Sequence, residues 1–160
     1  MSPYDEAPPT AVLLLGYGGL LPFAAALAGV LFDRAHQDAW IFALLAYAAV
    51  IASFVGALHW AFAMAIPARE TPLASRSYYW SVLPALVAWV ALLATHISSR
   101  QGGVIATALL TTIFVLHYAR DRALARVHPL PSWYLPLRLR LSGVACLCLV
   151  VSAAAVWWRT

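Results

Sequence analysis

Long runs of apolar residues alternate with short polar stretches along the whole chain. The runs cover residues 11–32, 40–66, 78–97, 102–119 and 139–158. A helix needs roughly 17–25 mainly apolar residues to cross the hydrocarbon core of a bilayer. Each run reaches that length. The pattern therefore predicts an all-α integral membrane bundle of five transmembrane helices, built as a single domain over residues 1–160.

The composition argues against a soluble protein. Hydrophobic residues make up 64% of the chain and charged residues 10%, against about 45–50% and about 25% in globular proteins. Cys146 and Cys148 both lie in the fifth run. Two positions apart on a helix, they point about 200° away from each other. They are therefore predicted to be buried thiols rather than a disulfide or a zinc-binding pair.

The charges predict an orientation. All ten basic residues are arginines. They lie between the apolar runs rather than on one basic face, which argues against nucleic-acid binding. With five spans, seven arginines fall on the side of the second and fourth connections and three on the other. The positive-inside rule then places the N-terminus in the cytoplasm and the C-terminus outside. Arginine without lysine, in an alanine-rich chain, is typical of a GC-rich bacterium, so the predicted location is a bacterial inner membrane.

The segment from residue 120 to residue 140 is the one long polar connection. Pro129, Pro131 and Pro136 argue against one continuous helix through it. Trp133 and Tyr134 stand between these prolines, and such residues anchor proteins at the membrane interface. The sequence therefore predicts a short cytoplasmic surface segment between the fourth and fifth helices.

Small residues mark two helix faces that can pack closely. The second helix carries Ala49, Ala52, Gly56, His59 and Ala63 at spacings of three and four, and the third carries Ser81, Ala85, Ala88, Ala91 and Thr95. Small residues let two membrane helices approach each other. We therefore predict that these faces meet. The opposite side of the second helix, with Ile51, Phe54, Val55, Leu58 and Phe62, is expected to face lipid.

His59 is the main candidate for a functional residue. It lies on the small-residue face, roughly 10 Å below the cytoplasmic end of its helix, and an ionisable group at that depth is a functional hypothesis by default. Two interpretations stay open: a neutral imidazole that bonds a neighbouring helix, or a group that binds a ligand, proton or cofactor. The candidate ligand-binding residues are Tyr17, His59, Trp60, Ser81, Trp133 and Arg138.

Other chemistry is sparse. The acidic residues Asp5, Glu6, Asp33, Asp38, Glu70 and Asp121 all flank the apolar runs, which weakens an ion pump, because such a protein normally needs an intramembrane acid. The sequence carries no phosphate loop and no HExxH motif, and Ser81 with His59 is the only conceivable nucleophile–base pair. We expect no enzyme, no metal and no cofactor. Haem between His59 and His117, or a quinone, is the alternative.

Several short motifs resemble a known family. They are Leu-Gly-Tyr-Gly-Gly-Leu-Leu-Pro-Phe at 15–23, Ser-Phe-Val-Gly-Ala-Leu-His-Trp at 53–60, Ser-Val-Leu-Pro-Ala-Leu-Val-Ala-Trp at 81–89, and Pro-Ser-Trp-Tyr at 131–134 followed by Leu137-Arg138 and Leu141-Ser142. Together they resemble DUF3429, a family of unknown function that includes a mitochondrial membrane protein of animals. The resemblance covers residues 15–151. It departs at Ala57, where the family has a second glycine, and at Ser142, where it favours threonine. It implies a five-helix bundle and supplies no activity.

The functional hypothesis is a non-catalytic accessory or assembly protein of the bacterial inner membrane, associated with a respiratory or photosynthetic complex. Its expected partners are membrane lipids and a larger membrane protein complex, and no nucleic acid. The alternative is a membrane protein that binds a lipid, quinone or haem in a pocket on the cytoplasmic side around His59.

Overall fold

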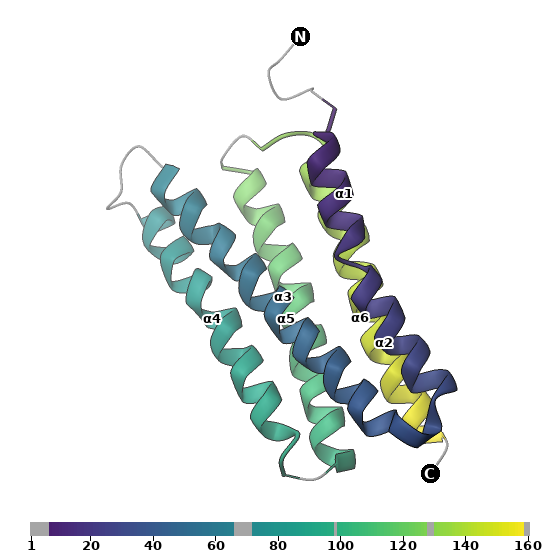
Figure 1. Ribbon diagram of the computed structural model, residues 1–160. Helices are drawn as coiled ribbons and strands as arrows, with labels where there is room; N and C mark the ends of the chain where they lie inside the picture. The colour runs from purple at the N-terminus through teal and green to yellow at the C-terminus, as the bar shows by residue number, and fades with distance from the viewer. Residues whose placement is uncertain (1–6, 66–71, 98, 128–129, 159–160) are drawn as a thin grey trace. The chain divides into compact units, whose positions relative to one another are not determined.

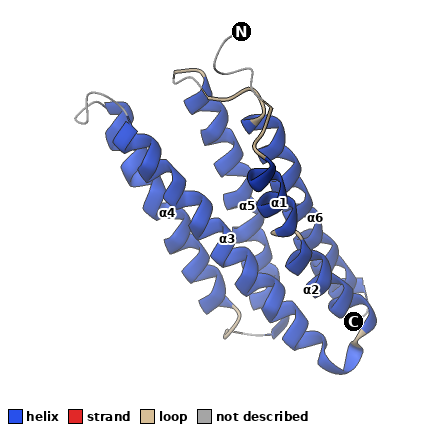
Figure 2. Cartoon of the chain, turned by 45° about the horizontal axis from the view of Figure 1, so that its top comes forward, coloured by secondary structure: helices blue, strands red, loops and turns tan. Residues whose placement is uncertain are grey.

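The computed structural model describes residues 7–65, 72–97, 99–127 and 130–158. Within them the chain forms α-helices and one short 3₁₀-helix, joined by short connections (Figures 1 and 2). The elements are α1 (Thr10–Gly18), α2 (Leu21–Phe32), η1 (Arg34–His36), α3 (Gln37–Ala65), α4 (Pro72–Ala94), α5 (Ser99–Ala125) and α6 (Tyr134–Trp158). Among the described residues, five stretches are long and apolar enough to cross a membrane. The predicted all-α, multi-pass membrane fold is confirmed.

The first span is broken into α1 and α2. Pro22 lies in the first turn of α2, where its missing N–H costs little but where it cannot continue the ladder of α1. The chain passes the break in near-helical conformation: Gly19 N–H donates to the carbonyl of Leu15, and Leu20 N–H to that of Tyr17. The span therefore keeps its direction while its hydrogen bonding changes.

The chain divides into two compact units. One comprises Met1–Leu44 and Phe114–Thr160, and the other Leu45–Ile113. In the first unit α2 lies alongside α6 (Figure 1). Phe23 of α2 packs edge-to-face on Phe114, with ring centroids 6.4 Å apart. A side chain at Gly16 of α1 would come within 3.2 Å of Leu141. The single-domain organisation stays a prediction.

The second unit contains the predicted contact between small faces. In both ribbon views α3 lies beside α4. A Cβ at Gly56 would lie 3.0 Å from Pro84 Cγ and 3.0 Å from the carbonyl oxygen of Ser81. The packing of the second helix on the third is therefore confirmed. All members of the small-residue face on α3 are buried: Ala49, Ala52, Gly56, His59 and Ala63.

Two details of the helix faces were predicted wrongly. Val55, expected to face lipid, is 5% exposed, because the buried side of α3 is wider than a single row of small residues. Ala85 was predicted to lie on the packed face of the third helix, but it is only half-buried, and its neighbour Pro84 takes the buried position on that turn of α4. The buried residues there, at positions 74, 77, 81, 84, 88, 91 and 94, recur every three or four residues.

The polar connection between the last two spans is shorter than predicted. α5 continues to Ala125 instead of ending at residue 119, and α6 begins at Tyr134 instead of residue 139. The interpretation of residues 120–140 as a surface segment is thus wrong at both ends. Pro136 fits in the first turn of α6, where helix N–H groups have no intrahelical acceptor. Arg138 and Asp121 are helical and buried.

Candidate functional site

His59 is almost fully enclosed by protein, with 1% of its surface exposed. Its imidazole meets two aromatic rings edge-on: Phe62, with centroids 6.0 Å apart, and Trp80 of α4, with centroids 6.4 Å apart. The prediction that His59 avoids the lipid side of α3 is confirmed. The two rings surround the imidazole with apolar, aromatic surface, and both interpretations of His59 use such an environment.

The serines of α4 lie on its buried face. Ser81 is 6% exposed, and its hydroxyl donates a 2.7 Å hydrogen bond to the carbonyl of Tyr78 in its own helix. The Ser81 hydroxyl proton is therefore already engaged in a hydrogen bond within α4. Ser77, one turn earlier, is 0% exposed. It was missed at the sequence level, although its spacing of four from Ser81 places both on one helix face.

Trp60 points elsewhere. It is 48% exposed, and its ring packs edge-on against Tyr78 with centroids 5.1 Å apart. Successive residues of a helix point about 100° apart. The structure therefore does not bring Trp60 to the buried surroundings of His59.

Tyr17 lies in the last turn of α1 and is 42% exposed. It lines a shallow, open depression whose other residues come from α1 and the start of α2: Thr10, Leu13, Leu14, Gly18 and Leu21. Tyr17 belongs to the first unit and His59 to the second. A shared space between these two residues stays a prediction.

Arg138 forms a buried ion pair that joins α5 to α6. Its Nε donates a 2.8 Å hydrogen bond to Oδ2 of Asp121. The two side chains are 9% and 0% exposed. Tyr134, one turn before Arg138, interacts with both charged groups, and the Trp133 ring packs on Tyr134 with centroids 6.3 Å apart. The predicted residues Trp133 and Arg138 thus belong to one cluster.

Asp121 is the residue that the sequence interpretation misplaced. It was taken to flank the fourth span, yet it lies inside α5 with no exposed surface. The sequence carried one signal, because Asp121 continues the row Leu110, Phe114 and His117 at intervals of three and four. The structure buries all four residues. A charge on the packed face of a helix indicates a partner on a neighbouring helix.

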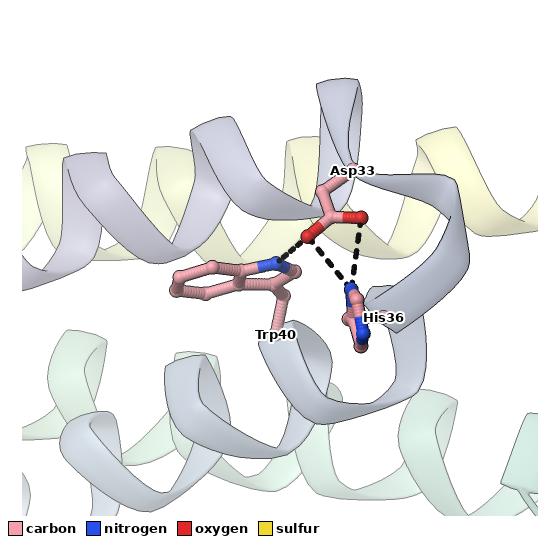
Figure 3. Close-up of polar contacts among 3 residues, drawn as sticks. All are labelled: Asp33, His36 and Trp40. Atoms are coloured by element: carbon pink, nitrogen blue, oxygen red, sulfur yellow. Dashed lines mark hydrogen bonds and ion pairs between the residues drawn. The ribbon is translucent and has the colours of Figure 1, made fainter.

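A third polar cluster fixes the turn between the first two spans (Figure 3). Asp33 Oδ2 accepts a 3.0 Å hydrogen bond from Trp40 Nε1, and the carboxylate contacts His36 Nδ1 at 3.1 and 3.2 Å. Gln37 Nε2 donates to the carbonyl of Val30 near the end of α2. The Trp40 hydrogen bond, followed by the contacts with His36, lowers the pKa of Asp33. This cluster was not predicted.

Comparisons with known proteins agree with the fold. The chain matches the family described as protein of unknown function DUF3429 over residues 8–154. It is similar to Transmembrane protein 69 of Xenopus tropicalis, with 35% identity over 146 residues. That alignment covers 90% of this chain and 54% of the relative, so the chain spans about half the relative's length. No solved structure matches the chain. With its spans, its motifs and nearly its whole length matched, this chain belongs to the DUF3429 family.

Proposed function

We propose that this protein is a non-catalytic accessory or assembly protein of the bacterial inner membrane, bound to a larger membrane complex of the respiratory or photosynthetic kind. The observation that carries the proposal is the poor coverage of the first span. Only 11% of its most apolar stretch is buried, against 28% to 39% in the other four spans. A partner helix would supply the missing neighbour.

The exposed face of α1 has the chemistry of a helix–helix contact. Leu14 and Leu15 are 69% and 78% exposed, and a Cβ at Gly18 would meet no atom within 4 Å. In a bilayer, glycine lets the backbone of a second helix approach closely, and packing rather than hydrophobicity then drives association. Tyr17, beside Gly18, adds a hydroxyl that can bond to such a helix.

The polar clusters support a structural role for the interior. Asp121 bonds to Arg138, Ser81 bonds to its own helix, and Asp33 bonds to Trp40. Each of these groups meets a partner from the chain itself. Their first role is therefore to stabilise the packing between helices or the structure of one helix. This fits a protein that offers a binding surface to a partner rather than one that performs a reaction.

The proposed location and orientation rest on the arginines. Arg120 and Arg122 lie in the last turns of α5, and Arg138 and Arg140 in the first turns of α6, so this end of both helices carries a concentrated positive charge. We place that end in the cytoplasm, with the N-terminus on the same side and the C-terminus in the periplasm.

Photocrosslinking in native membranes tests the accessory role. A benzoylphenylalanine at position 14 sits on the open face of α1, and one at Phe54, which is 63% exposed on α3, is the matched control. We expect position 14 to yield a protein adduct of constant size, identified by mass spectrometry, and position 54 to yield mainly lipid adducts. Lipid adducts alone at both positions would refute the proposal.

The alternative function is the binding of a lipid, quinone or haem around His59. The burial of its imidazole between Phe62 and Trp80 favours it, because an aromatic enclosure suits a flat ligand ring. Mild purification, solvent extraction and spectroscopy of the extract separate the two functions. A stoichiometric quinone, haem or lipid that disappears in His59→Gln would favour the alternative.

A further inference from the structure

We propose that the partner helix recognises α1 through the backbone carbonyl of Gly18, to which it donates a hydrogen bond from a hydroxyl or amide side chain. This recognition rests on the accessory role proposed above and adds the chemistry of the partner. Its basis is the break in the first span, the depth of that break in the membrane and the open surface around it.

The break between α1 and α2 removes the regular hydrogen-bond donor of Gly18. In a continuous helix, the carbonyl of residue 18 accepts a hydrogen bond from the N–H of residue 22. Pro22 stands at that position, and a proline has no N–H and pushes the carbonyl four residues earlier away from its ring. Among the described residues, the backbone N–H groups at the break donate to the carbonyls of Leu15 and Tyr17 rather than to Gly18. The Gly18 oxygen therefore lacks the donor that a helix normally supplies.

This oxygen lies within the apolar part of the membrane. Gly18 is the ninth and last residue of α1, in a span that runs from Thr10 to Phe32. It therefore lies about 12 Å from the start of the span, inside a hydrocarbon core that is about 30 Å thick. Lipid tails offer no hydrogen-bond donor, so a bare backbone oxygen is strongly unfavourable at this depth. Contact with a polar group is favoured over contact with lipid.

The surface around the carbonyl is open. Gly18 is exposed, and because glycine has no side chain, that exposed surface is backbone. Helix carbonyls point toward the C-terminal end of the helix, here toward Leu21 and Pro22, which are both exposed. A Cβ at Gly18 would meet no atom within 4 Å. A second helix can therefore come close enough to place a side chain on this oxygen.

The neighbouring groups of the chain point in other directions. Side chains of a helix lean toward its N-terminus, so the Tyr17 hydroxyl is carried away from the Gly18 carbonyl. Gly16 faces α6, because a Cβ there would lie 3.2 Å from Leu141. Gly18 comes two residues later and is turned by about 200° from that side. The side of α1 at Gly18 is thus turned away from α6.

The depth of the site selects the kind of donor. A charged side chain is costly near the middle of a bilayer, whereas serine, threonine, asparagine and glutamine commonly form hydrogen bonds between membrane helices. A hydroxyl or amide on the partner helix therefore suits the Gly18 carbonyl best.

Photocrosslinking from position 14 in native membranes tests this bond through substitution of proline. Pro22→Ala restores the N–H that a helix supplies to the Gly18 carbonyl, and it should fold because Pro22 is exposed. We expect the yield of the protein adduct to fall about threefold to tenfold, the effect of one hydrogen bond between membrane helices. Pro9→Ala is the matched control and should keep the wild-type yield, because Pro9 precedes α1 and removes no donor from a helix carbonyl.

Two other outcomes of the crosslinking have distinct meanings. A wild-type yield in Pro22→Ala would overturn the bond to Gly18 and leave the accessory role intact. The absence of any protein adduct from the wild type would refute the accessory role, and the bond to Gly18 with it.

Carbonyl ¹³C NMR of the full-length protein tests the same oxygen without relying on the partner. Glycine labelled with ¹³C at the carbonyl and with ¹⁵N gives a coupled pair only where two glycines adjoin, at 18–19 and 102–103. Gly103→Ala, used in every sample, removes the second pair, and its Cβ would meet no atom within 4 Å. The remaining signal belongs to the Gly18 carbonyl.

Hydrogen bonding moves a carbonyl ¹³C resonance to higher chemical shift. We expect the Gly18 signal of the protein in detergent to lie at lower shift than in Pro22→Ala, and to move to higher shift in the isolated complex. Equal shifts in the protein with and without Pro22→Ala would show that the chain already supplies a donor, and would overturn the proposal. A signal that stays in place in the isolated complex would also overturn it, while the accessory role would stand.

Discussion

Asp121 of α5 accepts a 2.8 Å hydrogen bond from Arg138 of α6, and neither side chain reaches the surface appreciably. The two residues stand 17 positions apart in the chain. Each residue lies about one turn inside its own helix. The pair therefore links the C-terminal end of α5 to the N-terminal end of α6, the two ends that the polar connection joins. This pair explains why both helices extend beyond the apolar runs of the sequence.

Removal of one partner from this pair should be costly. Asp121→Ala leaves the Arg138 guanidinium buried without its counter-charge, and breaking a buried pair in this way costs about 3–5 kcal/mol. Thermal unfolding in detergent should show a large fall in Tm. The double variant Asp121→Asn with Arg138→Gln should recover most of that loss. A single variant as stable as the wild type would mean that the pair adds nothing to the fold.

A large side chain at Gly56 should force α3 and α4 apart. A Cβ there already approaches Pro84 and the Ser81 carbonyl at 3.0 Å, so Gly56→Leu has no room. Overpacking in soluble cores costs about 1–3 kcal/mol, and we expect a loss of that size in detergent. Ala57→Leu, at the neighbouring exposed position, is the control and should change Tm little. Equal effects at both positions would show that the contact is looser than the geometry indicates.

Much of this architecture can be predicted from the sequence, because a bilayer imposes length and apolarity on each span. The contact at Gly56 was also predictable, since small residues at intervals of three and four leave few other ways to pack. The Asp121–Arg138 pair was not. Hydropathy treats every charge as solvated, and nothing in the pattern says that two charges 17 positions apart neutralise each other. The hydrogen bond between Trp40 and Asp33 could not be predicted either, because it depends on how the chain turns after α2.

The membrane orientation can be tested with fusions at two points. A periplasmic reporter such as alkaline phosphatase should be active when fused after Thr160 and inactive when fused after Ser132. A fluorescent protein that folds only in the cytoplasm should give the reverse pattern. These outcomes follow from the excess of arginines at the end shared by α5 and α6. Activity of the phosphatase at Ser132 would invert the assignment.

The turn after α2 should depend on pH through Asp33. Its pKa is lowered below the ordinary value of 3.8, first by the Trp40 hydrogen bond and then by His36. A carboxyl with a lowered pKa stabilises the fold above its ordinary pKa, and that contribution fades as the pH falls through the folded-state value. The Tm difference between wild type and Asp33→Asn should therefore shrink as the pH falls below 3.8.

The Trp40 indole provides the control for this titration. Trp40→Phe keeps a ring but removes the N–H that bonds to Asp33, so the pKa of Asp33 should move back up toward its ordinary value. The acid-dependent part of the Tm difference should then become smaller. An unchanged pH profile in Trp40→Phe would show that this hydrogen bond does not set the pKa of Asp33.

Two substitutions at His59 separate a packing role from a binding role. His59→Ala leaves a hole beside Phe62 and Trp80, whose rings lie 6.0 and 6.4 Å from the imidazole. Large-to-small changes in packed cores cost about 2–5 kcal/mol. His59→Gln keeps similar volume and both a donor and an acceptor, so its loss should stay below about 1.5 kcal/mol. For the accessory protein proposed above, we expect the Gln variant to keep both its stability and its crosslink from position 14. A Gln variant that is stable but has lost a stoichiometric quinone, haem or lipid would instead make His59 a binding residue, because only the imidazole, and not its volume or hydrogen bonding, would then have been replaced.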